Sequence, residues 1–337
     1  MVLLTYNRAE LLKKTLMSLV EQEFARQDFE VIVTDDGSTD NTWKVVREFI
    51  QSRELNIRYL ANPHSGGVRA LNNGIREAQG EFCLFLEDDV TASAGLLKEH
   101  YSKLRIHPKV SVVGAIELHP SLKGDKFTSL VMSTPSYVRK KMKSLCYVPD
   151  FFFTATNASV PSSIIKETLF DESFRYGYAD TDVALRLGKK GCRFTYNPRA
   201  KVFHMRKTSP EEMWEKKYSA GLNFLKLRVK HPDTTLLTPL YRQYMVGIKL
   251  TPMMKPFIGM LKDVFRSTYS QTILRILLAY YKFLGARAYE RTRMHKIHSH
   301  GPSPTPDRAN NGCRGDMTRL ALAYRGYGLR GLASGWV

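Results

Sequence analysis

Residues 82–89 read Phe-Cys-Leu-Phe-Leu-Glu-Asp-Asp. Residues 82–86 are an unbroken apolar run, which is typical of a strand buried on both faces, and the three acids follow it directly. Further strands are expected at residues 2–6, 29–34 and 57–60, and helical spacing of apolar residues at 8–23, 42–52 and 68–78. This β-α-β-α-β order predicts a doubly wound, mostly parallel sheet with helices on both faces.

Polar motifs follow three of these strands, at residues 5–8, 35–38 and 87–89. The carboxyl ends of parallel strands lie at one edge of a sheet, and ligands of such folds bind beyond that edge. We therefore expect the three motifs to meet in one site. No G-x-G-x-x-G segment follows the first strand, so a dinucleotide-binding fold is not favoured.

The rest of the chain is less regular. Strands are expected at residues 110–116, 193–196 and 200–203, and helices at 180–190, 211–229 and 272–291. From about Ile297 the sequence is rich in Gly, Pro, Ser, Asn and Arg, a composition typical of disorder. We predict three parts: an α/β domain over residues 1–205, a basic helical extension over 206–296 and a disordered tail over 297–337.

The net charge of +19 lies mainly in the second half, because residues 205–337 have 23 Lys or Arg and 8 Asp or Glu. A basic surface can bind nucleic acid, an anionic membrane or an acidic substrate. No nucleic-acid motif is present, so nucleic acid is not expected as a partner. The four cysteines show no paired or metal-type spacing, and no charged leader precedes the first strand, which favours a cytoplasmic location.

Two acidic clusters have both a chemical and a structural interpretation. Glu87, Asp88 and Asp89 could supply oxygen ligands to Mg2+ or Mn2+, or could form a solvated loop. Asp36 could accept a hydrogen bond from a nucleobase or ribose, while its neighbours are explained by a turn and a helix cap.

Two later residues also have two interpretations. Asp180 could be a general base, since an ordinary aspartate is ionised at neutral pH, or it could cap the following helix. His204 ends a predicted strand and could join a metal site or be structural.

The ordered motifs of residues 1–205 resemble those of glycosyltransferase family 2, whose catalytic domain has the GT-A fold. The matching segments are residues 5–8 (T-Y-N-R), 33–40 (V-T-D-D-G-S-T-D), 67–74 (G-V-R-A-L-N-N-G), 85–89 (F-L-E-D-D), 171–174 (D-E-S-F), 179–187 and 197–204. The resemblance implies that a nucleotide and its sugar are bound by Thr5, Tyr6, Asn7, Arg8, Asp36, Arg69, Glu87 and Asp88. It further implies that Asp89 binds a metal, that His204 completes that site and that Asp180 deprotonates the acceptor hydroxyl.

The expected function is therefore inverting, metal-dependent transfer of a sugar from a UDP- or dTDP-type donor to a saccharide or lipid-linked acceptor. No Q-x-x-R-W motif follows His204, which favours the addition of one or a few sugars over processive synthesis. Glu87 stands where the family usually has an aspartate, and Ala179 stands where it usually has an acid. These departures support an alternative, a catalytically weakened nucleotide-sugar-binding protein. Residues 272–291 form a basic amphipathic helix that either lies on an anionic membrane surface or packs on the catalytic domain.

Overall fold

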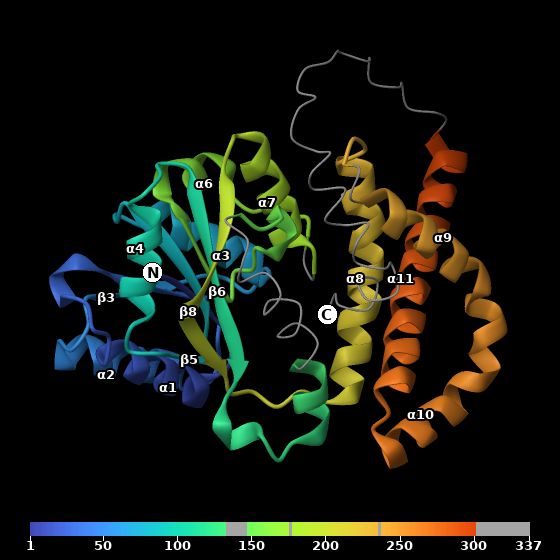
Figure 1. The fold of residues 1–337 in the computed structure, drawn as a ribbon, viewed down its shortest axis with the longest axis horizontal. Helices are drawn as coiled ribbons and strands as arrows, with labels where there is room; N and C mark the ends of the chain where they lie inside the picture. Colours follow the sequence, from blue (N-terminus) through green and yellow to red (C-terminus); the bar gives the residue numbers. More distant parts are fainter. Residues whose placement is uncertain (133–146, 175–176, 235–236, 301–337) are drawn as a thin grey trace. The chain divides into compact units, whose positions relative to one another are not determined.

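The computed structural model describes residues 1–132, 147–174, 177–234 and 237–300. The chain forms two compact units, one from Met1 to Ser209 and one that begins at Pro210. The first unit contains the sheet and the second is helical (Figure 1).

The first unit is built on an eight-stranded mixed sheet with the order β3-β2-β1-β4-β7-β6-β8-β5. Its strands are β1 (Val2–Thr5), β2 (Val31–Asp35), β3 (Ile57–Ala61), β4 (Phe82–Glu87), β5 (Val90–Ala92), β6 (Val110–Leu118), β7 (Asn157–Pro161) and β8 (Arg193–His204). The pairings among β1 to β4 are parallel, as is that of β6 with β8, whereas β7 and β5 run antiparallel to their neighbours. The expected α/β fold is confirmed, with antiparallel strands inserted in its second half.

Successive side chains of the sheet pack alternately into two separate hydrophobic cores. In β1, Leu3 joins one core and Val2 the other, and in β4 the same division separates Leu84 and Leu86 from Cys83 and Phe85. All these side chains are buried because successive strand residues point to opposite faces and both faces are covered. This double burial explains why the strands appear in the sequence as continuous apolar runs.

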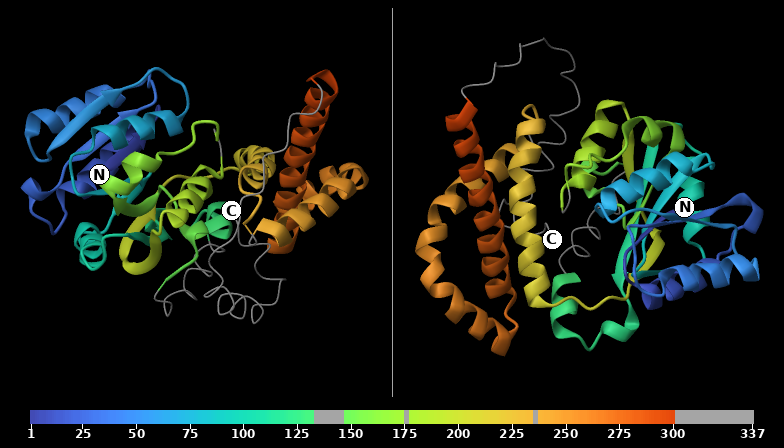
Figure 2. Two further views of the ribbon diagram at one scale, coloured as in Figure 1. Left: turned by 90° about the horizontal axis from the view of Figure 1, so that it is seen from above. Right: turned by 180° about the vertical axis from the view of Figure 1, so that it is seen from behind.

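Helices cover both faces of the sheet (Figure 2). The first core takes residues from α1 (Ala9–Val20), α2 (Thr42–Ser52) and α4 (Leu96–Leu104). The second takes residues from α3 (Gly67–Glu77), α6 (Ser162–Thr168) and α7 (Ala179–Lys189). Short 3-10 turns occur at η1 (Arg26–Asp28), η2 (Pro120–Leu122) and η4 (Asp150–Phe152).

The region after residue 89 differs from the sequence-based expectation in two ways. Residues 193–204 form one strand, β8, where two short strands were expected, and the register of the β6–β8 pair shifts between Gly114 and Ala115. In addition, β5, α4, β7 and α6 were not predicted. These elements are short, and their positions depend on antiparallel pairing with distant strands rather than on a local periodic pattern.

The second unit consists of α8 (Pro210–Lys230), α9 (Leu237–Met254), η5 (Lys255–Phe257), α10 (Ile258–Thr268) and α11 (Gln271–His300). The apolar residues of α11 are largely used inside this unit, since Leu274, Leu277 and Ala286 are buried. α11 also reaches His300, four residues into the predicted tail, whose remainder lies outside the described residues. Among the described helices, none is long and apolar enough to cross a membrane.

The helices α8 and α11 approach so closely that only glycine fits between them. A Cβ atom on Gly221 would lie 1.9 Å from the carbonyl oxygen of Lys282, and one on Gly285 would lie 1.9 Å from that of Tyr218. Backbone atoms cannot move aside as flexible side chains do. Gly259 in α10, by contrast, has no heavy atom within 4 Å of its virtual Cβ.

We predict opposite effects for two Gly-to-Ala substitutions in this unit. Gly221→Ala should destabilise the protein by about 1–3 kcal/mol because the two helices must separate. Gly259→Ala, in open space, should be neutral or stabilise by up to about 1 kcal/mol through helix propensity. Urea unfolding of the full chain, followed by circular dichroism, measures both, and equal effects would contradict the tight helix contact.

Candidate active site

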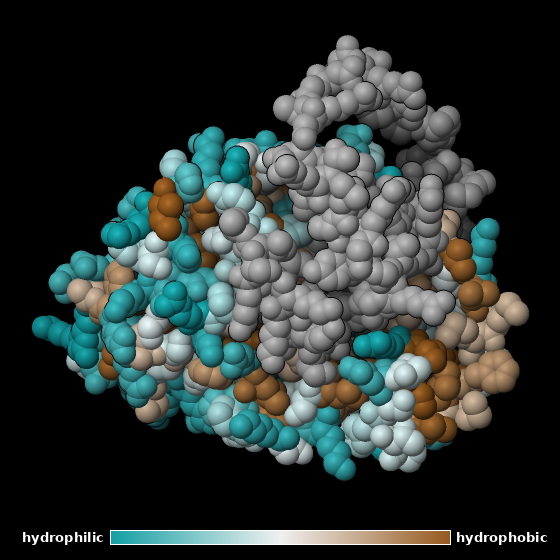
Figure 3. Space-filling model, in the orientation of Figure 1, coloured by the Kyte–Doolittle hydropathy of each residue, from teal (hydrophilic) through white to brown (hydrophobic). Residues whose placement is uncertain are grey.

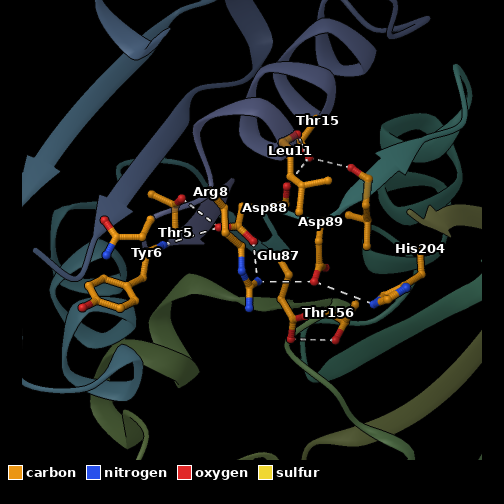
Figure 4. Close-up of polar contacts among 12 residues, drawn as sticks. Thr5, Tyr6, Arg8, Leu11, Thr15, Glu87, Asp88, Asp89, Thr156 and His204 are labelled. Atoms are coloured by element: carbon orange, nitrogen blue, oxygen red, sulfur yellow. Dashed lines mark hydrogen bonds and ion pairs between the residues drawn. The ribbon is translucent and has the colours of Figure 1, made fainter. Parts of the chain in front are cut away.

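The carboxylate of Asp88 lies at the centre of the polar cluster at the carboxyl end of the sheet (Figure 4). Its Oδ2 accepts hydrogen bonds from the Thr5 hydroxyl at 2.8 Å and from the Tyr6 backbone N–H at 3.4 Å. Its Oδ1 accepts a 2.8 Å hydrogen bond from the Arg8 guanidinium. These contacts follow from the fold, because β1 and β4 are parallel neighbours and end at the same edge of the sheet.

Asp89 lies beside Asp88, and His204 approaches it from the far end of the sheet. The antiparallel pairing of β5 with β8 places Val90 opposite His204, and the His204 Nε2 lies 3.7 Å from the Asp89 Oδ2. The other oxygen of Asp89, Oδ1, is buried and accepts no hydrogen bond from the residues that the structure describes. The structure thus brings together the two predicted metal ligands, and one of them has an unused acceptor.

Arg8 provides positive charge to both aspartates. Its Nη1 atom lies 2.8 Å from Asp88 Oδ1 and 3.3 Å from Asp89 Oδ2, and both carboxylates are buried. Burial raises the pKa of the Asp88 carboxyl, and the charge and hydrogen bond of Arg8 oppose that rise. Arg8 is therefore the countercation of the two aspartates in the protein alone.

Glu87 points away from this pair toward the β7 side of the site. Its Oε1 accepts a 3.0 Å hydrogen bond from the hydroxyl of Thr156 (Figure 4). Burial, followed by the negative charge of Asp89, raises the pKa of Glu87 to about 7, and Asp180 and Asp88 also contribute. Of the three consecutive acids, Glu87 is thus the one that contacts the segment before β7.

Asp180 lies in the first turn of α7, next to the same segment. Burial raises its pKa to about 6, although hydrogen bonds from the Ala155 backbone and the Thr154 side chain partly offset this effect. The neighbouring acid Asp182 has a different task, since it forms a 2.7 Å ion pair with Arg186, which also donates to the carbonyl oxygen of Leu169. Asp180 therefore faces the site while Asp182 anchors α7.

On the other side of the cluster, Asp36 holds a loop rather than standing free. Its Oδ1 accepts hydrogen bonds from the backbone N–H groups of Ser65 and Gly66 at 3.0 and 3.1 Å, and its Oδ2 lies 3.1 Å from the His64 Nδ1. The His64 ring stacks on Tyr6, with centroids 4.4 Å apart and planes inclined by 17°. His64 was missed from the sequence because it lies in a loop without a recognisable motif.

The remaining predicted residues are divided between structural contacts and the periphery. Asn7 has a left-handed backbone (φ 50°), and its Oδ1 accepts hydrogen bonds from the backbone N–H groups of Thr39 and Asp40, which joins the loops after β1 and β2. Arg69, in the first turn of α3, is exposed and lies 4.0 Å from Glu172. The structure does not bring Arg69 into contact with the aspartate pair.

Polar side chains on α1 and just after it support the segment that follows β4, and they were not predicted from the sequence. The Thr15 hydroxyl lies within hydrogen-bonding distance of the carbonyl oxygens of Asp88 and Val90, at 2.9 and 2.8 Å. One turn later, Ser18 Oγ accepts a hydrogen bond from the Ala92 N–H. Gln22, two residues beyond the end of α1, donates to the Ser93 carbonyl. The spacing is helical, but Thr, Ser and Gln do not contribute to an apolar pattern.

A mixed α/β sheet with carboxylates gathered where its strands end is the architecture of the GT-A nucleotide-sugar transferases. The structure superimposes on a mannosyltransferase from Pyrobaculum calidifontis in complex with GDP-Man and Mn2+, with a TM-score of 0.54, 18% identity and coverage of 97% of this chain and 79% of the other. It also superimposes on residues 1–349 of Staphylococcus aureus TarS in complex with UDP-GlcNAc, with a TM-score of 0.53, 18% identity and coverage of 88% and 91%. The expected GT-A fold is thereby confirmed.

Sequence comparison adds the family. The model of "Glycosyl transferase family 2" matches residues 1–169, and the chain belongs to glycosyltransferase family 2. Curated relatives include the chondroitin synthase of Escherichia coli, 26% identical over 68% of this chain, and the validoxylamine A glucosyltransferase of Streptomyces hygroscopicus, 31% identical over 58%. The alignments span 38% and 52% of these two relatives.

We predict that Arg8→Ala changes how strongly Mn2+ stabilises the protein. Loss of the hydrogen bonds to the two buried carboxylates should destabilise the metal-free protein by about 1.5–3 kcal/mol. Added Mn2+ should then raise the melting temperature of the variant more than that of the wild type, because the cation replaces the missing charge.

Differential scanning calorimetry provides the measurement, and Arg58→Ala is the matched control. Arg58 has the same exposed side-chain fraction as Arg8, 33%, and pairs with Glu30 away from the cluster. The control should lose stability without changing its response to Mn2+. Equal Mn2+ responses of the Arg8 variant and the wild type would contradict the role of Arg8 as countercation of the two aspartates.

Proposed function

We propose that this protein transfers a sugar from a nucleotide-diphosphate donor to a hydroxyl group of a saccharide or lipid-linked acceptor, with inversion at the anomeric carbon. One observation carries the proposal. Asp180, a carboxylate with a pKa near neutrality, lies beside the Thr154–Thr156 segment, and Thr156 binds Glu87, which directly precedes Asp88 and Asp89. A candidate base and a candidate diphosphate site are thus adjacent, as a single displacement requires.

The residues at the tip of β4 fit a divalent cation such as Mn2+ or Mg2+. Asp89 has a buried oxygen without a hydrogen-bond donor among the described residues, and the carboxylates offer the oxygen ligands that both ions prefer. In this proposal Asp89 and His204 hold the cation, with Asp88 shared between cation and ribose. When bound, such a cation neutralises the charge that builds on the departing diphosphate.

Few protein ligands are available for that cation. Within the described residues, no group of three or more His, Cys, Asp and Glu side chains is placed to hold a metal ion by itself. Mg2+ in nucleotide enzymes is commonly held by one or two carboxylates together with phosphate oxygens and water. The donor's diphosphate would add oxygen ligands to a cation that the protein alone holds weakly.

The opposite side of the cluster would receive the nucleoside. Tyr6 and His64 offer flat rings on which a base can stack, and Asp36 has lone pairs for a base N–H although it also holds the loop. We favour a UDP- or dTDP-type donor. A UDP-GlcNAc complex of a protein with the same fold supports this choice.

In the reaction, the Asp180 carboxylate takes the proton from the acceptor hydroxyl as its oxygen attacks the anomeric carbon. The new bond from oxygen to carbon forms while the bond from the anomeric carbon to the diphosphate oxygen breaks, and the diphosphate leaves with the electron pair. Arg8 offers positive charge beside the leaving group, and the cluster around Asp88 fixes its position. Attack from the side opposite the leaving group inverts the configuration.

Asp180→Asn should abolish transfer and preserve donor binding. The amide cannot accept the hydroxyl proton, so kcat should fall by about 10²–10⁴-fold, while the donor's dissociation constant should change little. Transfer is measured as Mn2+-dependent release of nucleoside diphosphate across a panel of nucleotide sugars and acceptors, and binding by calorimetry.

Glu167→Gln, at an exposed position paired with Lys190 on the same domain, serves as the control and should retain activity. The experiment also separates the enzyme from its rival, a binding protein without turnover. A wild-type protein that binds nucleotide sugars but transfers none of them would establish the rival.

The activity should also depend on pH. Because the pKa of Asp180 is raised to about 6, the carboxyl is protonated and inactive below this value. We expect kcat/KM to rise as pH increases through about 6 and then to level off. The folded state binds this proton more tightly than the unfolded chain, so the contribution of Asp180 to stability is largest at low pH and is lost as pH rises toward 6.

The pH profile is measured at saturating Mn2+ in the wild type and in Glu87→Gln. The pKa of Glu87 is raised to about 7, so the variant removes a second group whose ionisation could produce the same rise of kcat/KM with pH. If the rise near pH 6 persists in the variant, it belongs to Asp180. If the rise disappears with Glu87, that assignment is wrong.

A further inference from the structure

The helical unit exposes a row of large apolar side chains along α9, η5 and α10. The six residues of this stripe are Val246, Leu250, Met253, Phe257, Met260 and Val264. Their exposed fractions run from 39% for Val264 to 70% for Met253. Successive members are four and three residues apart in turn, so that they follow one side of the helical path. Figure 3 shows apolar side chains gathered at its right-hand edge, over the arc of α9 and α10.

This apolar stripe is not the side that stabilises the helical unit. On the same path, Ile248, Ile258 and Phe265 are buried at 7%, 7% and 1% exposure, and Phe265 packs against Trp214 of α8. α9 and α10 therefore have an inner apolar side that forms the core of the unit and an outer apolar side that faces solvent. A contiguous exposed apolar patch on a folded unit marks a surface for another molecule.

The charge around the apolar stripe indicates what that molecule is. From Leu237 to Ser270 the sequence has five Lys or Arg residues and a single acid, Asp263. Lys249 and Lys255 are exposed and adjoin the stripe in sequence, next to Leu250 and two residues from Phe257. An apolar side flanked by exposed lysines complements the acyl chains and phosphate groups of an anionic bilayer.

A second helix fits the stripe less well. The apolar stripe passes through the 3-10 turn of Lys255–Phe257, and Pro252 and Pro256 lie on the same path. A helical partner requires a regular seam on both helices, which this interruption removes. A bilayer surface makes no such demand, because acyl chains adapt to side chains at any spacing.

We propose that the apolar stripe of α9–η5–α10 docks the protein onto an anionic lipid bilayer, with Met253, Phe257 and Met260 inserted among the acyl chains and Lys249 and Lys255 beside lipid phosphates. The site differs from the one expected at residues 272–291, since α11 uses its apolar residues mainly within the helical unit. Nothing in this inference depends on sugar transfer, so a protein that transfers no sugar could still show it.

Flotation of the full-length protein with vesicles tests the proposal. We expect binding to vesicles of phosphatidylcholine mixed with phosphatidylglycerol, weaker binding to phosphatidylcholine alone, and a loss of binding at high salt. The double variant Met253→Ser/Phe257→Ser should bind at least tenfold more weakly, since each buried side chain of this size contributes about that factor. Lys249→Gln/Lys255→Gln should remove most of the preference for phosphatidylglycerol.

The matched control is Met17→Ser/Ile106→Ser, which removes two apolar side chains of similar exposure, 53% and 61%, from the first unit. It should bind vesicles like the wild type, and circular dichroism should show that both serine variants remain folded. Three results would overturn the proposal: no binding by the wild type, equal binding by the Met253/Phe257 variant, or binding that ignores lipid charge. If the wild type forms a concentration-dependent dimer that the Met253/Phe257 variant loses and the control keeps, the stripe is instead a contact between two copies of the chain.

Discussion

The carboxylate of Asp88 is buried where β4 ends, and its burial determines the arrangement around it. A buried charge must be matched by hydrogen bonds and an opposite charge. Three groups at the end of β1 provide them: the Thr5 hydroxyl, the Tyr6 N–H and the Arg8 guanidinium. These contacts fix the loop after β1 to the tip of β4, 80 to 83 residues away in the sequence. Glu87 and Asp89 belong to the same tip, and the pairing of β5 with β8 brings His204 to it.

The sequence predicts the first half of this arrangement well, and the reason is physical. Strands such as β4, buried on both faces, are continuous apolar runs, and parallel strands bring their carboxyl ends to one edge. The proximity of Thr5, Asp36 and Asp88 could therefore be expected from their places after three strands. The hydrogen bonds of each residue could not be predicted in the same way. Asp36 and Asn7, for example, bind backbone groups of neighbouring loops.

The second half depends on contacts that leave no local pattern. Asn157, fully buried in β7, donates to the carbonyl oxygens of Ala115 and Ala200, and its own side-chain oxygen lies 2.9 Å from the ring of His100. Gly114 leaves the room for it, because a Cβ there would lie 2.2 Å from the Asn157 amide. Burial keeps His100 uncharged by lowering its pKa to about 4. In the sequence, Asn157 and His100 are only isolated polar residues among apolar ones, so the periodic pattern does not predict their contacts.

Thr15 and Ser18 of α1, together with Gln22 just after this helix, connect two segments that are remote in the sequence. α1 begins directly after Asn7 and Arg8, and these three polar side chains hold the backbone from Asp88 to Ser93. The loop after β1 and the aspartate pair therefore keep their mutual geometry before any ligand arrives, and ligand binding spends little free energy on ordering them.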